Sequence, residues 1–400
     1  MKQGEVVSGY RVTTQPTNAG GGKCMWAFAV RDGEEYFIKQ FLAPKRPRPD
    51  AGSERSRQLR MRLCQDFEER HRSIMERLRP DMHGGGHLVL ATDFFVHGTT
   101  YYKVTARIDT STLEKPQLLD PRHKTVLLKT LAVSVNLLHG IGVVHGDLKP
   151  ANVLVQKYGG NAFHIAKVID FDDSYLSGSP PGRDDIAGDS LYGAPEWRRY
   201  VQGDESVQPR QLTTAVDVFA LGLMTHHYLT GSLPQYDDRF GSPADAVNAR
   251  DELRLDPRLT DAMRNLLRAM LSRAPSSRPR ASTVVSALKD PAVCGLQHPR
   301  PGTSRTAPSG SSHDSVEAGG LNGTSASRLR GNLSGTSRRR ATGTNASATP
   351  EDGIEAVPRT GRETSETTPR VSRVRINLGT RRYAVPRTDM PPITSEENTT

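Results

Sequence analysis

The sequence predicts an α+β domain of two lobes, a small one rich in strands and a larger helical one, followed by a disordered tail. Strand-like alternation concentrates between Tyr10 and Ala106, and helical spacing dominates from Arg122 onward. Near residue 293 the composition changes to Ser, Thr, Gly, Pro and Arg without an apolar face, and such a segment cannot bury enough apolar area to fold. We therefore expect a domain over residues 8–293 and a disordered tail over 294–400.

The first lobe contains several strand-like segments and one long helical segment. The expected strands are Tyr10–Val12, Trp26–Val30, Tyr36–Lys39, Leu88–Phe95 and Thr100–Ala106. Asp32-Gly33 is a typical hairpin turn between the second and third of them. Helical spacing runs from Leu59 to Leu78, and its expected inner positions are Leu63, Phe67, Ile74 and Leu78.

Helices dominate the second lobe. We expect them at about 122–141, 214–230, 259–272 and 280–289. A short apolar strand, Val153-Leu154-Val155, follows the first of these helices. A strand-rich half followed by a helix-rich half is typical of the α+β class.

Cysteine usage and hydropathy bear on the compartment. The three cysteines, Cys24, Cys64 and Cys294, are odd in number and widely spaced, which favours a reducing compartment over a disulfide framework. No stretch approaches the roughly 18–20 apolar residues that a membrane span needs. The N-terminus lacks the apolar core of a signal peptide. We therefore expect a cytoplasmic protein without a membrane span.

The formal net charge is +10, which we attribute to an Arg-rich surface and tail, and we expect no nucleic-acid partner. The tail is dense in Ser and Thr, with Thr349-Pro350 and Thr368-Pro369 as candidate sites. We hypothesise that it is autophosphorylated and docks a phospho-reading partner. A solvated linker and a salt-sensitive contact with nucleic acid or membrane are the alternatives.

The segment His145–Asn152, with the sequence HGDLKPAN, carries the most specific chemistry in the chain. Phosphoryl transfer needs phosphate-binding groups, metal-binding oxygens and a group that orients the attacking hydroxyl. Asp147 would accept or orient the hydroxyl proton, Lys149 would neutralise charge on the moving phosphoryl group, and Asn152 would hold a metal ion through its side-chain oxygen. The alternative is an ordinary turn between helix and strand, which these residue types also favour.

Asp170 is the expected second metal ligand. It ends the apolar strand Lys167-Val168-Ile169, eighteen positions after Asn152. Two oxygen ligands on adjacent strand ends suit Mg²⁺, which keeps several of its waters when bound.

A glycine-rich turn and a strand lysine are candidate phosphate contacts. Gly20, Gly21 and Gly22 lie between the first two strand-like segments, and Lys39 ends the third. Glycines let backbone N–H groups approach phosphate closely, and a lysine placed so could reach the α- and β-phosphates. The turn lacks the G-x-G-x-x-G pattern, so a flexible turn and a solvated lysine remain the alternatives.

These residues resemble the motifs of the protein kinase family over about residues 8 to 290. Asp147, Lys149 and Asn152 match the HRDxxxxN catalytic loop, and Asp170 matches the Asp of DFG. The resemblance implies a two-lobed protein-kinase fold and a eukaryotic-like Ser/Thr kinase of bacterial type. It also implies protein substrates, ATP as phosphate donor, and Mg²⁺, or Mn²⁺ in its place. Lys39 matches the lysine that contacts ATP and pairs with a helix glutamate.

Further positions extend the resemblance beyond the catalytic loop. Glu196 lies in an Ala-Pro-Glu segment that matches APE, and Asp217 matches the helix aspartate that braces the catalytic loop. Arg278 resembles the late arginine that pairs with the APE glutamate, which implies a buried ion pair. For the glutamate beside Lys39, Glu68 and Glu69 both lie on the expected helix; we prefer Glu69, and a solvated acidic helix face is the alternative.

Three positions depart from the family pattern. Gly146 replaces the arginine before the catalytic aspartate, which makes the chain a non-RD kinase. We therefore expect that phosphorylation of the activation loop is not the main on-switch. Asp172 replaces the glycine of DFG and adds a charge. Asp189 replaces a threonine, and its carboxylate would either repel Asp147 or bind Lys149.

Two alternative functions remain open. A small-molecule phosphotransferase of the aminoglycoside or choline kinase type shares the His-Gly-Asp and Asp-Phe-Asp segments, but its relatives lack the elements at Glu196, Asp217 and Arg278. A pseudokinase or scaffold that binds nucleotide is favoured by Asp172 and the unusual glycine turn. The intact catalytic residues favour an active protein kinase.

Overall fold

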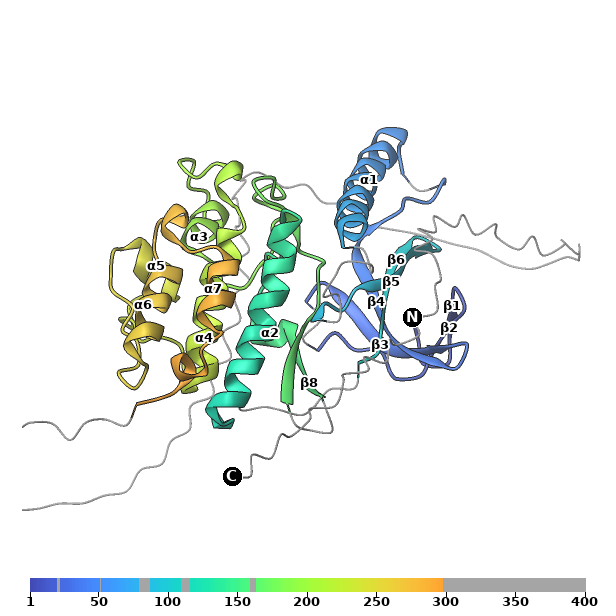
Figure 1. Ribbon diagram of the computed structural model, residues 1–400. Helices are drawn as coiled ribbons and strands as arrows, with labels where there is room; N and C mark the ends of the chain where they lie inside the picture. Colours follow the sequence, from blue (N-terminus) through green and yellow to red (C-terminus); the bar gives the residue numbers. More distant parts are fainter. Residues whose placement is uncertain (20–21, 51, 79–86, 109–115, 159–162, 298–400) are drawn as a thin grey trace, which may run out of the picture. The chain divides into compact units, whose positions relative to one another are not determined.

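The computed structural model describes residues 1–19, 22–50, 52–78, 87–108, 116–158 and 163–297. The expected tail, residues 294–400, lies outside the described residues beyond position 297. The packed part extends past both ends of the expected domain, 8–293, because Val7 and Cys294 are buried in the core. The predicted α+β arrangement, a strand-rich lobe followed by a helical one, is confirmed (Figure 1).

The first lobe is built on an antiparallel sheet with the strand order β1-β2-β3-β4-β6-β5. Its strands are β1 (Val6–Val7), β2 (Tyr10–Val12), β3 (Cys24–Arg31), β4 (Glu34–Lys45), β5 (Ala91–His97) and β6 (Thr100–Ala106). The turn at Asp32-Gly33 joins β3 to β4, and both of its residues have positive φ, as a tight hairpin requires. The resulting register places Lys39 of β4 opposite Trp26 on one side and Lys103 on the other.

Helix α1 (Glu54–Arg77) packs on this sheet and begins five residues earlier than the predicted Leu59. The Ser53 side chain accepts a hydrogen bond from the backbone N–H of Ser56 and caps the helix. Of the predicted inner positions, Leu63 is wrong, because it is 53% exposed. The buried stripe runs through Cys64 instead, one position further around the helix, and continues at helical spacing to Phe67.

The second lobe is helical. The described helices are α2 (Pro121–Gly140), α3 (Pro195–Val201), α4 (Ala215–Thr230), α5 (Pro243–Asn248), α6 (Asp261–Met270) and α7 (Ala281–Ala287). Short 3₁₀ turns are η2 (Pro116–Leu118), η3 (Pro150–Asn152), η4 (Pro209–Gln211), η5 (Pro275–Ser277) and η6 (Pro291–Cys294). The four predicted helices correspond to α2, α4, α6 and α7. Helices α3 and α5 were not predicted because each is too short to show a periodic pattern.

Two small two-stranded sheets carry the loops between the helices. Strand β8 (Val153–Tyr158), which includes the predicted apolar strand, pairs with β9 (Phe163–Val168). Strand β7 (Val143–Val144) pairs with β10 (Tyr175–Leu176). The segment 145–152 therefore starts directly after β7, and Asp170 lies two residues after the end of β9. These strands pack on α2 and bring the two polar loops to the same side of the lobe.

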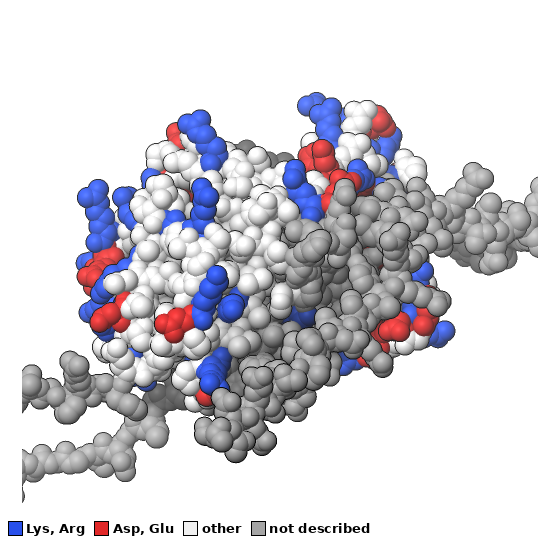
Figure 2. All heavy atoms as spheres, viewed as in Figure 1, with Lys and Arg blue, Asp and Glu red and all other residues white. Residues whose placement is uncertain are grey.

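Charged side chains are mixed over the face drawn in Figure 2, where blue and red groups alternate over α1 and over the helices of the second lobe. Helix α1 carries several exposed arginines, among them Arg55, Arg60 and Arg62. In the described parts of the chain, no helix combines the length and apolar character required to cross a bilayer.

A buried ion pair connects the start of α3 to the turn at η5. Arg278 donates to both carboxylate oxygens of Glu196, at 2.6 and 2.7 Å. It also donates to the backbone carbonyls of Ala215 and Ser272, and its guanidinium lies over the Phe219 ring. Because Glu196 belongs to α3, Ala215 and Phe219 belong to α4, and Arg278 directly follows η5, the guanidinium joins α3, α4 and η5 into one unit.

We predict that Glu196→Gln destabilises the protein strongly. The amide keeps the shape of the side chain but leaves the Arg278 charge buried without its counter-ion. Removing one partner of a buried pair costs about 3–5 kcal/mol, and urea unfolding followed by circular dichroism measures the loss. Glu252→Gln, at an exposed position, is the matched control. A loss below about 1 kcal/mol, the level of an exposed pair, would contradict the prediction.

Candidate active site

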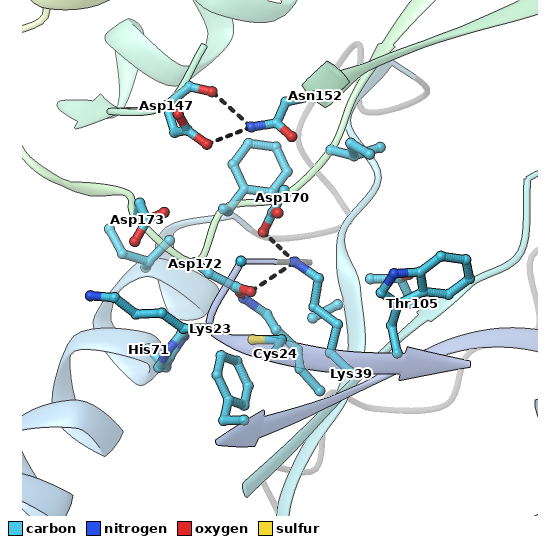
Figure 3. Close-up of a pocket in the computed structure, with 18 of the residues that line it drawn as sticks. Lys23, Cys24, Lys39, His71, Thr105, Asp147, Asn152, Asp170, Asp172 and Asp173 are labelled. Carbon is cyan, nitrogen blue, oxygen red and sulfur yellow. Dashed lines mark hydrogen bonds and ion pairs between the residues drawn. The ribbon is translucent and has the colours of Figure 1, made fainter. Parts of the chain in front are cut away.

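A cavity of about 890 Å³ is lined by residues of both lobes. Strands β3, β4 and β6 contribute Cys24, Lys39 and Lys103, and the loops after β7 and β9 contribute Asp147 and Asp170. The acidic and basic side chains of these elements converge in the cavity (Figure 3). The structure therefore brings together the polar residues on which the sequence analysis concentrated.

The Asp147 carboxylate is held by two neighbours on its own loop. Lys149 Nζ lies 2.9 Å from Asp147 Oδ2 and 3.1 Å from Oδ1. The Asn152 amide nitrogen donates to Asp147 Oδ2 at 2.9 Å and to the Asp147 backbone carbonyl at 2.8 Å. This use of the amide nitrogen turns the Asn152 side-chain oxygen away from Asp147, where it is available as a ligand (Figure 3).

The backbone of the loop is fixed by Asp217 of α4. This buried carboxylate accepts hydrogen bonds from the backbone N–H groups of His145 and Gly146, at 2.8 and 3.1 Å. His139 Nε2 lies 3.0 Å from the same carboxylate. The His145 ring nitrogen Nε2 in turn lies 3.0 Å from the Ile169 carbonyl, so the loop is also bound to the segment that precedes Asp170.

Gly146 is required by the backbone around it. Its φ is +80°, a conformation that side chains rarely adopt. A Cβ atom there would lie 2.7 Å from the Asp173 carbonyl oxygen and 3.1 Å from the Tyr175 ring. The arginine that the family pattern has at this position would therefore collide with the chain at Asp173.

Asp170 faces Lys39 across the cavity. Its backbone has a φ of +66°, and its Oδ1 lies 2.6 Å from Lys39 Nζ. Burial and the neighbouring Asp172 carboxylate raise the pKa of Asp170, and Lys39 opposes this shift. Burial together with the same carboxylates raises the pKa of Asp173 to about 6. Carboxylates that crowd each other in this way are suited to a bound cation, which would relieve their repulsion.

The donor set fits a magnesium ion that keeps several waters. Asp170 and the outward-turned oxygen of Asn152 are the two hard oxygen ligands that the sequence predicted. Among the described residues there is no group of three or more His, Cys, Asp or Glu side chains arranged to hold a metal by themselves. The site therefore resembles a metal site completed by phosphate oxygens and water rather than a closed protein cage.

Lys39 and Lys103 share the carboxylate of Asp172. Lys103 Nζ lies 2.6 Å from Asp172 Oδ1, and Lys39 Nζ lies 3.0 Å from Oδ2. Burial alone would raise the pKa of Asp172, but Lys103 and Lys39 outweigh it and hold that pKa well below its usual range. For Lys39, burial alone would lower the pKa, but the Asp172 and Asp170 carboxylates outweigh burial and raise that pKa above its usual value.

The expected pairing of Lys39 with Glu69 is not formed. Glu69 is exposed on α1, because the buried face of that helix passes through Phe67 and His71. The other candidate, Glu68, accepts hydrogen bonds from Arg46 and from the Tyr101 hydroxyl. Lys103 was not predicted as a partner in this network. A lysine inside the apolar strand β6 was the signal that could have identified it.

The Asp189 carboxylate is bound rather than repelled. Its Oδ2 lies 3.5 Å from Lys149 Nζ, and its Oδ1 accepts the backbone N–H groups of Leu191 and Tyr192. Of the two expectations for Asp189, the structure shows the contact with Lys149. The activation segment, which runs from Asp170 to Glu196, is thus tied to the loop of Asp147 through Lys149, which binds both Asp147 and Asp189.

Aromatic side chains form the wall of the cavity on the first lobe. Trp26 and Phe37 lie with ring centroids 5.2 Å apart, and Phe28 packs edge-on against both. Phe37 precedes Lys39 by two positions, where the family's V-A-I-K pattern has alanine. From the sequence, these rings were expected only as strand residues. They offer a flat apolar surface of the kind on which a nucleotide base stacks.

The glycine turn is only partly described. Gly20 and Gly21 lie outside the described residues. Gly22 lines the cavity with a φ of +55°, and a Cβ atom there would meet nothing within 4 Å. Its conformation, rather than a close contact, is the reason for a glycine at this position.

Comparisons with known proteins agree with this geometry. The family described as "Protein kinase domain" matches residues 22–288, which is more than half of the chain. A serine/threonine-protein kinase/endoribonuclease IRE1b of Arabidopsis thaliana is 33% identical over 164 residues, 40% of this chain and 17% of the relative. Serine/threonine-protein kinase PkaA of Streptomyces coelicolor is 28% identical over 230 residues, 55% of this chain and 38% of the relative.

A third relative, serine/threonine-protein kinase pkn3 of Myxococcus xanthus, is 28% identical over 155 residues, 37% of this chain and 27% of the relative. The matched part of the chain thus spans well under half the length of each of these relatives. The family match covers the cavity, the catalytic loop and the Glu196–Arg278 pair together. The chain therefore belongs to the protein kinase family, as a eukaryotic-like member with Ser/Thr kinases among its relatives.

Proposed function

We propose that the chain is an active Ser/Thr protein kinase that transfers the γ-phosphate of ATP to protein hydroxyl groups. The observation that carries this proposal is the Asp147 carboxylate, held at hydrogen-bond distance by Lys149 and Asn152 inside a cavity that also contains Lys39 and Asp170. Each group that phosphoryl transfer needs is present in one place. We also propose a cytoplasmic location and no nucleic-acid partner.

In this proposal Asp147 orients the substrate hydroxyl and accepts its proton as the bond to phosphorus forms. Lys149, whose pKa is raised above its usual value by Asp147 and Asp189 against the effect of burial, stays charged and neutralises the moving phosphoryl group. Lys39 contacts the phosphates that remain on the nucleotide. Asn152 and Asp170 hold Mg²⁺, which supplies charge stabilisation on the phosphates when bound.

The structure also bears on the two alternative functions. A nucleotide-binding pseudokinase is favoured by one observation, the ion pair between Lys39 and Asp172, because it occupies a cation that phosphate would otherwise use. A small-molecule phosphotransferase is disfavoured by the second lobe, where Asp217 braces the loop and Arg278 binds Glu196. These elements belong to the part of the chain that the family match covers.

We predict that Asp147→Asn abolishes transfer while nucleotide binding persists. The amide cannot accept the hydroxyl proton, so the turnover number is expected to fall by about 10²–10⁴-fold. Radiolabelled ATP with a generic protein substrate measures transfer, and Asp184→Asn, the same change at an exposed position, is the control.

The same assay separates the three functions. Protein labelling that is lost in Asp147→Asn supports the kinase. Nucleotide binding without any transfer by the wild-type protein would contradict it and support the pseudokinase. Labelling confined to small hydroxyl compounds would support the small-molecule enzyme.

We further predict that activity does not depend on activation-loop phosphate. Gly146 replaces the arginine that would read such a phosphate, and Arg183 already holds this segment by donating to the backbone carbonyls of Asp204 and Val207.

The test is the triple variant Ser177→Ala, Ser179→Ala and Ser190→Ala, which is expected to keep its transfer rate. Ser174 is left unchanged because it is buried and donates to the His145 carbonyl. Loss of activity in a triple variant that unfolds at the wild-type temperature would overturn the prediction.

For the tail, which lies outside the described residues, we propose autophosphorylation that creates a docking site for a phospho-reading partner. Thr349 and Thr368, each followed by proline, are the candidate positions. Mass spectrometry after incubation with Mg-ATP is expected to find phosphate beyond residue 297, and Asp147→Asn is the control for transfer by another enzyme. A tail free of phosphate in an active preparation would exclude the idea.

A further inference from the structure

We propose that Asp172 and Lys103 are positioning residues for Lys39, and that together they take the place of the helix glutamate that the family pattern uses. Asp172 supplies the carboxylate that orients Lys39, and Lys103 anchors Asp172 from the other side. This inference rests on the proposed function of the cavity as a nucleotide site. It identifies which side chains hold the phosphate-binding lysine.

The first argument is register. Lys39 on β4 and Lys103 on β6 are directly paired across neighbouring antiparallel strands, so their side chains leave the sheet on the same face. Both line the cavity, and their side chains are only 14% and 8% exposed. Two like charges placed opposite each other on a sheet repel, and here burial strengthens the repulsion. The pair therefore requires a shared counter-ion.

Asp172 meets that requirement with both of its oxygens. Oδ1 binds Lys103 and Oδ2 binds Lys39, while Asp170 binds Lys39 from the other side. Two ammonium groups thus face two carboxylates, and the formal charges balance. Lys39 has three N–H donors, of which Asp170 and Asp172 account for two, and the third is available to a phosphate oxygen.

The second argument is the composition of α1. On the described chain, the residues of this helix that line the cavity include no glutamate; they are Leu63, Asp66, Phe67, Arg70, His71, Ile74 and Met75. Phe67 and His71 are buried, whereas the one acidic residue among them, Asp66, is exposed. His71 is 2% exposed, and burial holds its pKa well below the usual value, so it adds no charge. Glu68 is engaged by Arg46 and Tyr101, and Glu69 is exposed.

The consequence is that a different segment of the chain holds the Lys39 side chain in position. In the family pattern, a shift of the helix breaks the lysine–glutamate pair. Here the carboxylates beside Lys39 come from the segment 170–172, which also supplies the proposed metal ligand Asp170. The lysine and the metal ligand are therefore positioned by one short segment, and a displacement of α1 does not remove the partner of Lys39.

The test uses Asp172→Asn, Lys103→Met and the double variant. Asp172→Asn keeps the shape but leaves two buried ammonium groups with one carboxylate, so Lys39 is displaced. We expect the turnover number divided by the KM for ATP to fall by about 10–100-fold, the range that small misplacements of reacting groups produce. Adding Lys103→Met removes the repulsion, so the double variant is expected to recover part of the loss.

This recovery distinguishes positioning from a merely structural role. If the three side chains only stabilised the fold, the double variant would be worse than either single variant, and that result would overturn the inference. A rise in activity or ATP affinity in Asp172→Asn would also overturn it, because Asp172 would then be a competitor of phosphate. If Glu69→Gln lowered the turnover number divided by the KM for ATP as much as Asp172→Asn does, the helix glutamate rather than Asp172 would position Lys39, and the inference would be wrong. Asp184→Asn is the control.

A binding measurement separates this inference from the proposed function. Trp26 lines the cavity, so its fluorescence reports binding of Mg-ATP and of adenosine. The ratio of the two affinities measures the phosphate contact of Lys39, and it is expected to fall in Asp172→Asn and to recover in the double variant. A wild-type protein that binds ATP without transfer would refute the kinase proposal, and the ratio would still decide the inference. Whether or not the wild-type protein transfers phosphate, a ratio that is unchanged in Asp172→Asn would overturn the inference.

Discussion

The site depends first on the buried carboxylate of Asp217. Two consecutive backbone N–H groups, of His145 and Gly146, donate to it, and buried N–H groups without such an acceptor would be costly. The contact attaches the loop of Asp147 to α4, whose buried residues occupy nearly every face of the helix. Because Arg278 binds the first residue of that helix through its carbonyl and also binds Glu196, the loop and the activation segment are positioned from one rigid element.

A second constraint is the balance of charge in the cavity. The aspartates that line it include Asp147, Asp170, Asp172 and Asp173, and burial makes the repulsion among these four strong. Lysines offset this charge. Lys39 binds Asp170 and Asp172, Lys149 binds Asp147 and Asp189, and Lys103 shares the Asp172 carboxylate with Lys39. The two unusual acids, Asp172 and Asp189, are therefore not isolated substitutions. Each is matched by a lysine within 3.5 Å, and the network they form retains the groups that the proposed chemistry uses.

The departures from the family pattern share a local cause. Asp172 lies in the stretch that follows β9. Gly146 packs against the same stretch, because the Asp173 carbonyl occupies the space beside it. With an arginine excluded there, the activation segment is held by other contacts, among them Arg183 and Asp189. The stretch that follows β9 thus accommodates both Gly146 and Asp172, and Asp147 keeps its contacts with Lys149 and Asn152.

The sequence by itself determined the succession of a strand-rich lobe and a helical lobe, the longer elements within them, the residues of the catalytic loop and the family to which they point. These depend on local spacing: the alternation of strands, the hairpin at Asp32-Gly33 and the interval between Asp147 and Asn152. Short helices such as α3 and the true inner stripe of α1 were not predictable, because one turn of helix carries little periodicity and Leu63 differs from Cys64 by a small rotation.

Only the tertiary structure decided which charges meet. Lys39 and Lys103 are far apart in the sequence, and Asp172 follows both, so no spacing rule links them. The sheet register places the two lysines side by side, and the buried charge then selects Asp172 rather than the exposed Glu69 as their partner. Pairing of this kind is set by burial and distance, since a carboxylate stabilises a buried ammonium only when the fold brings both into the same low-dielectric space.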